Sequence, residues 1–169
     1  MPRNKLIPDD DVFAAVRRLL TEGGDKAVAF GSVARTTGLA APTLAQRFGT
    51  RDGMVRAAMM AAWDALDGAT EAAEAGAELA PKGALAILKA LAGHMGPELL
   101  AADFRDAELR ARAAGWRARL EAALALRLGG GKKGREAAAL LFAIWQGQSL
   151  WDQAGGKGVR LKDALKRLG

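Results

Sequence analysis

The sequence predicts an all-α protein in which a small N-terminal domain of three helices precedes a larger helical bundle. Apolar residues recur at helical spacing along nearly the whole chain. Glycine and proline clusters interrupt this pattern where helices would end. No segment shows the alternating apolar and polar residues of a Val-, Ile- or Thr-rich strand, so no β-strand is expected.

The N-terminal domain is expected over residues 1–52. The first helix begins near Asp9, because three consecutive aspartates favour a helix N-terminus. Pro42 is compatible with the third helix because it falls in the first turn, where its missing N–H breaks no helical hydrogen bond. Gly38 lies at the bend between the second and third helices. The first helix is expected to begin near Asp9–Asp11 and to be stopped by Gly23-Gly24, and the next two are expected over roughly residues 30–37 and 41–48.

The C-terminal domain is expected over residues 53–169. Thr50 is a good N-cap for a fourth helix that runs through Trp63 and Leu66. An alanine- and glutamate-rich helical segment then ends before Pro81. The glycine-rich, basic run at 129–134 is expected to be a flexible connection. Further helices are expected over residues 82–94, 98–104, 106–128, 135–154 and 159–168.

The second and third helices form a candidate helix-turn-helix. Leu44 and Phe48 lie one turn apart and face inward, which leaves Thr43, Gln46 and Arg47 on the outer face. These side chains suit contacts with base edges and phosphates, and the second helix of such a motif enters the DNA major groove. An ordinary helical hairpin with a polar outer face has the same spacing and stays an alternative.

This stretch resembles the DNA-binding head of the TetR family of bacterial transcriptional repressors, over roughly the first third of the chain. The matching segments are Val33-Ala34, Gly38-Leu39-Ala40, Thr43-Leu44-Ala45 and Phe48-Gly49-Thr50-Arg51-Asp52. The chain departs from the family pattern at Ala45, where a tyrosine that touches the DNA backbone is usual, and at Ala40, which replaces a serine N-cap. Gln46-Arg47 stands where aromatic residues or histidine are common.

The motif and the resemblance together predict a set of DNA contacts. Thr43, Gln46 and Arg47 are expected to face the major groove. Thr50 and Arg51 are expected to hold phosphate, Thr50 partly through the positive N-terminus of the fourth helix. Arg3 and Lys5 are expected to add a mobile N-terminal arm.

The charge distribution agrees with an anionic partner for the N-terminal domain. The net charge is +6, and residues 26–60 hold five basic residues against the single acid Asp52. A basic recognition region is what phosphate contact requires. The second concentration of positive charge, in residues 132–169, is not explained by this motif; a solvated helix face with Lys132-Lys133 in a loop is favoured over a second nucleic-acid site.

The segment 135–154 predicts a homodimer. Its apolar surface is wider than one core needs, and a helix of this kind is normally buried on two sides. Gly147 would let another backbone approach closely. The interface residues are expected to be Leu141, Ile144, Gln148 and Trp151, and the family resemblance implies the same arrangement through the last two long helices. A central helix buried entirely within one chain is the alternative.

The family resemblance also implies a cavity for a small-molecule effector in the C-terminal domain. The candidate lining residues are Met59, Trp63, His94, Trp116, Phe142 and Trp145. Aromatic and methionine side chains at helical spacing are also ordinary core residues, which is the alternative at each position.

The residue inventory provides poorly for catalysis. The chain has one histidine, His94, two serines and no cysteine, and it lacks metal-ligand spacing and a phosphate-binding glycine loop, so neither an enzyme, a metal site nor a cofactor is expected. With no signal peptide and no apolar run of membrane-spanning length, a cytoplasmic protein without membrane contact is expected.

The most specific interpretation is a homodimeric, sequence-specific transcriptional regulator that binds a double-stranded DNA operator. It would be a repressor released by a small-molecule effector. The second interpretation is a helical dimer that has lost specific DNA binding and acts as a ligand-binding or interaction module. Ala45 keeps the second interpretation open, because it lacks the contact with the DNA backbone that the family resemblance implies for a tyrosine at this position.

Overall fold

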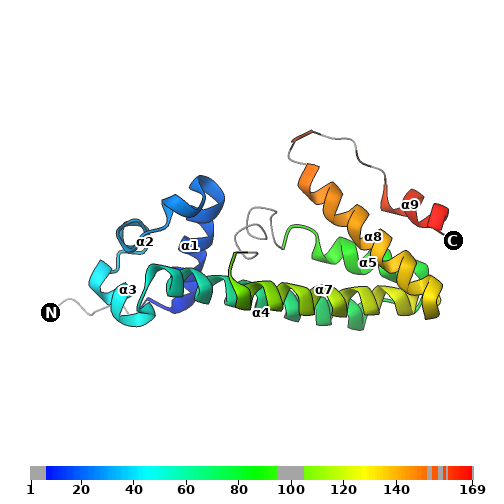
Figure 1. Cartoon of the computed structure of the whole chain (residues 1–169), viewed down its shortest axis with the longest axis horizontal. Helices are drawn as coiled ribbons and strands as arrows, with labels where there is room; N and C mark the ends of the chain where they lie inside the picture. The colour runs from blue at the N-terminus through cyan, green and yellow to red at the C-terminus, as the bar shows by residue number, and fades with distance from the viewer. Residues whose placement is uncertain (1–6, 95–104, 152–153, 156–157, 159, 169) are drawn as a thin grey trace. The chain divides into compact units, whose positions relative to one another are not determined.

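The computed structural model describes residues 7–94, 105–151, 154–155, 158 and 160–168. All regular structure in these residues is helical, as predicted (Figure 1). The chain divides into two compact units. We call Met1–Asp64 with Glu98–Arg110 the head unit, and Ala65–Pro97 with Ala111–Gly169 the body unit. The boundary therefore falls within a long helix, after Asp64, whereas the sequence placed it at residue 52.

The head unit is built on three short helices and the start of a long one. Their order is α1 (Asp9–Gly23), the 3-10 turn η1 (Asp25–Ala27), α2 (Phe30–Thr37), α3 (Ala41–Phe48) and the first part of α4 (Arg51–Gly76). The three predicted helix ranges of the N-terminal domain are thus confirmed. Val12, Val16, Val33, Leu44 and Met54 are completely buried and form its core.

Two contacts connect α1 to the later helices of the head unit. The ring centroids of Phe13 in α1 and Phe48 in α3 lie 5.9 Å apart. The Arg17 guanidinium donates a hydrogen bond to the carbonyl oxygen of Ala58 in α4, at 3.3 Å. Because α1 contacts both α3 and α4, the position of α3 is fixed by its packing on α1 as well as by its turn with α2.

Among the described residues, the body unit contains the rest of α4, α5 (Pro81–Leu91), the part of α7 (Ala107–Arg127) after Arg110, α8 (Gly131–Trp151) and α9 (Leu161–Leu168). The helical segment predicted after Leu66 is the continuation of α4, and α5 ends at Leu91, before His94. The helix predicted over 98–104 lies outside the described residues. No helix in the described part of the chain is both long and apolar enough to cross a membrane.

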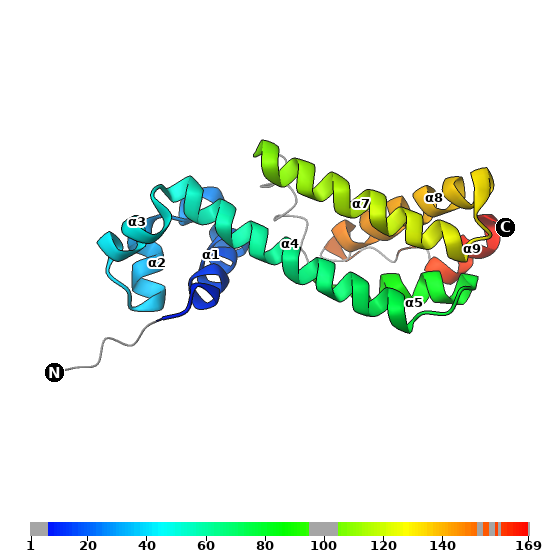
Figure 2. The same cartoon turned by 90° about the horizontal axis from the view of Figure 1, so that it is seen from below.

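Within the body unit, α4 and α7 run side by side (Figures 1 and 2). Arg112 pairs with Asp67, and the Arg119 guanidinium lies 3.3 Å from a carboxylate oxygen of Glu71. In addition to these ion pairs, the indole N–H of Trp116 in α7 donates to the hydroxyl of the completely buried Thr70 in α4, at 2.9 Å. The hydrogen bond satisfies both buried polar groups, so the apolar core can close around them.

Arg127 closes the C-terminal end of α4. This side chain is only 6% exposed, and its guanidinium donates to the carbonyl oxygens of Glu74 and Ala77 at 2.8 and 3.2 Å. A third hydrogen bond, of 2.9 Å, reaches Ala123 one turn earlier in α7. The last carbonyls of a helix have no partner within the helix. The Glu74 carbonyl also accepts from the N–H of Ala77 at 3.3 Å, so Arg127 is its second donor, and Arg127 in addition supplies a donor to the Ala77 carbonyl.

The glycine run between α7 and α8 is a compact turn, and the predicted flexible connection over 129–134 is wrong. Gly129 and Gly130 have φ values of 92° and 66°, which only glycine adopts readily, and α8 already begins at Gly131. Lys132 and Lys133 therefore lie in the first turn of a helix. A Cβ at Gly134 would lie 2.9 Å from the carbonyl oxygen of Ala125, so the two helices approach too closely there for a side chain.

Candidate nucleic-acid interface

The α2–α3 pair has the geometry of a helix-turn-helix. Gly38 ends α2 in the left-handed conformation, with φ 77° and ψ 5°, and its N–H donates to the carbonyl of Ala34 at 2.8 Å. A residue with a Cβ is strained in this conformation by about 1–2 kcal/mol. Completely buried Val33 and Leu44 hold the two helices against the rest of the head unit. The turn and its core residues fix which side of α3 faces solvent.

Each of the two helices starts in a different way. In α2, the Ser32 hydroxyl accepts a hydrogen bond from the N–H of Ala29 at 2.9 Å and donates to the carbonyl of Ala27 at 2.7 Å. In α3, Ala40 provides no side-chain cap, and Pro42 occupies the first turn. Pro42 has no N–H to satisfy, and the Thr43 N–H donates to the carbonyl oxygen of Ala40 at 3.0 Å, so α3 starts without a side-chain cap.

The outer face of α3 carries short neutral polar side chains. Gln46 and Pro42 are exposed and Thr43 is half-buried, in agreement with the predicted outward orientation of Thr43 and Gln46. Ala45, at the position where the family resemblance leads one to expect tyrosine, is half-buried. This face presents amide, hydroxyl and methyl groups with little bulk between them.

Arg47 lies toward α1. Its guanidinium donates to the carbonyl oxygen of Ile7 at 2.9 Å and to a carboxylate oxygen of Asp9 at 3.3 Å. A quarter of the side chain is exposed. The predicted contact between Arg47 and the major groove would require this guanidinium to leave both acceptors.

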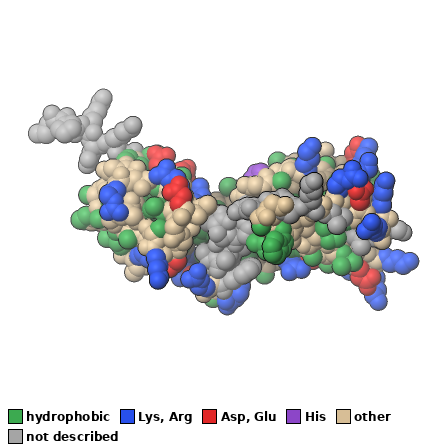
Figure 3. Space-filling view, turned by 90° about the horizontal axis from the view of Figure 1, so that it is seen from above, with side chains coloured by type: hydrophobic (Ala, Val, Ile, Leu, Met, Phe, Trp, Pro, Cys, Tyr) green, Lys and Arg blue, Asp and Glu red, His purple; other side chains and the backbone are tan. Residues whose placement is uncertain are grey.

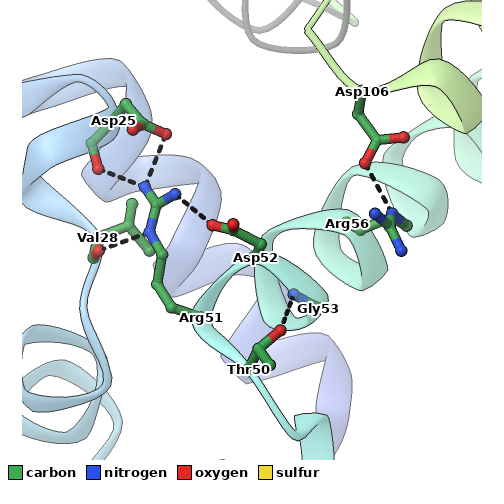
Figure 4. A network of polar contacts seen from close by, with 8 residues as sticks. All are labelled: Asp25, Val28, Thr50, Arg51, Asp52, Gly53, Arg56 and Asp106. Carbon is green, nitrogen blue, oxygen red and sulfur yellow. Dashed lines mark hydrogen bonds and ion pairs between the residues drawn. The ribbon is translucent and has the colours of Figure 1, made fainter.

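Thr50 is the N-cap of α4, as the sequence predicts. Its hydroxyl accepts a hydrogen bond from the N–H of Gly53 at 2.9 Å (Figure 4). A Cβ at Gly53 would lie 2.6 Å from the carbonyl oxygen of Phe48, so the chain needs glycine where α4 starts beneath the end of α3. Thr50 is exposed, which leaves the start of α4 accessible to an anion.

Arg51 is held by hydrogen bonds within the head unit (Figure 4). Its guanidinium donates to the carbonyl of Val28 at 3.1 Å and to the carboxylates of Asp25 and Asp52 at 2.7 and 2.8 Å. A further bond reaches the carbonyl of Asp25. Donating to the carboxylates of Asp25 and Asp52 raises the pKa of Arg51, and accepting the hydrogen bond from Arg51 lowers the pKa of Asp25. In this structure, Arg51 ties η1 to the start of α4, and its predicted phosphate contact stays a prediction.

Arg51→Met should loosen η1 without unfolding the head unit. The substitution keeps the aliphatic part of the side chain and removes every hydrogen bond to Asp25 and Val28. Amide hydrogen exchange over residues 25–29 should become faster, because the open state of this segment is no longer opposed by those bonds. Lys26→Met serves as the matched control, since the Lys26 side chain has no such bonds. Unchanged exchange in Arg51→Met would show that η1 is held by other contacts.

A second ion pair joins α4 to the start of α7 inside the head unit. Arg56 lies 2.7 Å from a carboxylate oxygen of Asp106, and the other Asp106 oxygen caps α7 by accepting from the N–H of Glu108 at 2.9 Å (Figure 4). The Arg56 hydrogen bond is the main cause of the lowered pKa of Asp106. With the folded-state pKa values of Asp25 and Asp106 lowered, both pairs stabilise the fold above the ordinary aspartate pKa of 3.8. That stabilisation is lost as pH falls through the lowered values.

Two basic side chains that sequence reasoning did not select remain accessible. Lys26 and Arg35 are exposed, and neither forms a hydrogen bond or ion pair with the described part of the chain. Arg35 lies on the side of α2 opposite the buried Val33. The sequence could have indicated that Arg35 has no ion pair within its helix, because no acidic residue stands three or four positions before or after it. Figure 3 shows Lys and Arg side chains at the surface of both units.

The proposed arm residues Arg3 and Lys5 lie outside the described residues.

The predicted effector-binding residues are divided between the two units. Met59 and Trp63 are completely buried in the head unit, whereas His94 is exposed. In the body unit, Trp116, Phe142 and Trp145 form an aromatic cluster, with centroid distances of 6.1 and 6.0 Å along the series. The three cluster residues are 4–8% exposed, so they form part of the core of the body unit.

The predicted interface residues on α8 lie on two sides of the helix. Leu141 is completely buried within its own chain, which corrects its placement at an interface. The preceding residue, Leu140, is 52% exposed, and Trp151 is 65% exposed. Leu140, Ile144, Gly147 and Trp151 follow helical spacing and form one outward stripe, which we call the α8 stripe. Ile144 and Gln148 are half-buried.

Comparison with known proteins identifies the fold. No model of a known protein family matches the sequence, and no curated protein matches it. The TetR family transcriptional regulator PfmR from Thermus thermophilus superimposes with a TM-score of 0.68 at 19% identity, over 94% of this chain and 95% of that one. A protein from Rhodococcus sp. assigned to the same family gives a TM-score of 0.64 at 20% identity, over 95% of this chain and 93% of that one. The predicted fold, a helix-turn-helix head followed by a helical body, is confirmed.

Proposed function

We propose that the chain is a TetR-type regulator that binds double-stranded DNA through α3. The observation that carries the proposal is the outward face of α3. It presents Thr43 and Gln46 from a short helix that is held in place by the Gly38 turn and the buried Leu44. Such a helix fits the major groove, where amide and hydroxyl groups recognise base edges. The fold likeness supports this proposal, since both structures described above are regulators of transcription.

The DNA-binding form is proposed to be a homodimer joined through the α8 stripe. A leucine and a tryptophan that are both more than half exposed on one helix face form an apolar surface that a partner would cover. Gly147 supports close approach, because a Cβ there would meet nothing within 4 Å in the same chain. Glycine in a helix costs about 0.5–1 kcal/mol relative to alanine, so packing within the chain does not account for it. A two-fold dimer would present two α3 helices to a palindromic site.

Regulation is proposed to act by release of DNA on binding a small apolar or amphipathic effector in the body unit. The aromatic cluster of Trp116, Phe142 and Trp145 is packed in the core of the body unit, so such a molecule would contact it by separating these side chains. An effector lowers DNA affinity only if it binds the free form more tightly than the DNA-bound form. Tryptophan emission reports on this cluster during titration with candidate compounds.

Arg35 provides the experiment that tests DNA binding. Arg35→Gln should weaken binding to all duplexes alike and reduce the slope of log affinity against log salt by about two, because the proposed homodimer loses one phosphate contact from each of its two chains. Fluorescence anisotropy of a labelled duplex at several salt concentrations measures both quantities. Lys89→Gln is the matched control, since Lys89 is equally exposed but lies on α5 in the body unit.

Two results would count against this proposal. A salt slope that stays the same in Arg35→Gln would remove Arg35 from the DNA surface. Absence of salt-dependent DNA binding by the unmodified protein would reject the regulator and favour the second interpretation, a helical dimer that acts without DNA. Ala45 and the intramolecular bonds of Arg47 and Arg51 are the features that this second function would explain.

A further inference from the structure

The recognition helix carries only one arginine, and its guanidinium is bound to the chain itself. Arg47 donates to Ile7 and Asp9, both near the start of α1. It lies about 100° around the helix from Gln46, on the side that faces α1. No other residue of α3 is charged. The commonest specific contact with guanine, a two-point contact from arginine to O6 and N7, is therefore not offered by the outer face.

The groups that α3 does offer match A·T pairs. Gln46 is exposed, and a glutamine amide forms a two-point contact with adenine by accepting from N6–H and donating to N7. Pro42 is exposed and Thr43 is partly exposed at the start of the helix, one turn before Gln46. Their apolar atoms suit the thymine methyl group, which projects into the major groove.

We propose that α3 reads an A·T-centred half-site, with Gln46 contacting adenine and Pro42 and Thr43 contacting thymine methyl groups. This inference rests on the proposed DNA-binding function and names the sequence class that α3 recognises. Arg47 acts as a positioning residue that fixes α3 to the start of α1. Lys26 and Arg35 are left to supply sequence-independent attraction to phosphate.

Selection of duplexes from a random library by the full chain tests the base preference. The unmodified protein should enrich an A·T pair at one position in each half-site, and Gln46→Ala should lose that preference. The affinity of Gln46→Ala for the selected site should fall by about 5- to 150-fold for each half-site that the protein contacts, while its affinity for random DNA stays unchanged. Arg47→Met should retain the A·T preference, although its overall affinity falls if α3 is less firmly held. A G·C preference that disappears in Arg47→Met would overturn the proposal.

Uracil substitution tests the methyl contacts without altering the protein. Replacing thymine by uracil in the selected half-site removes only the methyl group, so the affinity should fall about fourfold at a contacted position. Thr43→Ser, which removes only the threonine methyl, should make the protein less sensitive to this replacement. Equal affinity for thymine- and uracil-containing sites at every position would contradict the methyl contacts. A protein that binds DNA but selects G·C-rich sites rejects this inference alone, whereas a protein that binds no DNA also rejects the proposed function.

Discussion

Leu140→Glu should convert the dimer into a monomer at micromolar concentration. The Leu140 side chain is 52% exposed on the α8 stripe, so in a two-fold dimer two copies would be buried. Complete burial of an exposed leucine contributes about 1.5–3 kcal/mol; because Leu140 is already about half-buried, the two copies together contribute about 1.5–3 kcal/mol. The dissociation constant should therefore rise by at least about tenfold, and the two buried carboxylates would raise it further.

Sedimentation velocity over a range of concentrations measures this change directly. Leu79→Glu is the matched control, because Leu79 is 79% exposed but lies outside α8. Circular dichroism should show the same helix content in both variants, since neither leucine belongs to the core. An unmodified protein that is monomeric at micromolar concentration would rule out the α8 stripe as a dimer interface. If Leu79→Glu raised the dissociation constant more than Leu140→Glu, the interface would lie around Leu79 and not on the α8 stripe.

Arg127→Met should lower the free energy of unfolding by about 3 kcal/mol. The substitution roughly conserves the aliphatic volume and removes three hydrogen bonds to carbonyl oxygens, two of them at the end of α4. Leaving a buried carbonyl unpaired costs about 1–3 kcal/mol; this cost falls on Ala77, because the Glu74 carbonyl keeps the N–H of Ala77 as a donor at 3.3 Å. Relief of the buried charge offsets part of this cost, which is why the expected loss is smaller than the full sum.

Urea unfolding at one protein concentration gives the comparison, because dimerisation makes apparent stability depend on concentration. Arg135→Met provides the control, since Arg135 is exposed on α8 and has no hydrogen bond or ion pair in the described residues; its effect should stay within about 0.5 kcal/mol. A loss below about 1 kcal/mol for Arg127→Met would mean that water satisfies the end of α4 equally well.

The helices of the head unit could be predicted closely because their signals are local. Three aspartates, the Gly38 bend, Pro42 and the Thr50 cap each act within one helical turn of the boundary that they mark. The turn between α7 and α8 was predicted less well. A run of glycines has the same composition whether it is flexible or compact, and the close approach of Gly134 to Ala125 depends on packing between two helices.

The candidate site could be predicted in part. Spacing alone placed Thr43 and Gln46 on the outer face of α3, because Leu44 had to face the core. The bonds of Arg47 to Ile7 and of Arg51 to Asp25 join residues far apart in the sequence, which periodicity does not report. Leu140 and Leu141 differ by one position, and only the packing around α8 decides which of two adjacent leucines is buried.

The central claim is that this chain is a homodimer that binds a specific DNA sequence through α3. One titration tests it most directly. The unmodified protein is titrated at physiological salt with its best selected duplex and with a scrambled duplex of equal length. We expect an affinity ratio of about 10³ or more, with two chains per duplex and half-sites about one helical turn apart. Affinities that agree within about tenfold, or a complex with one chain per duplex, would contradict it.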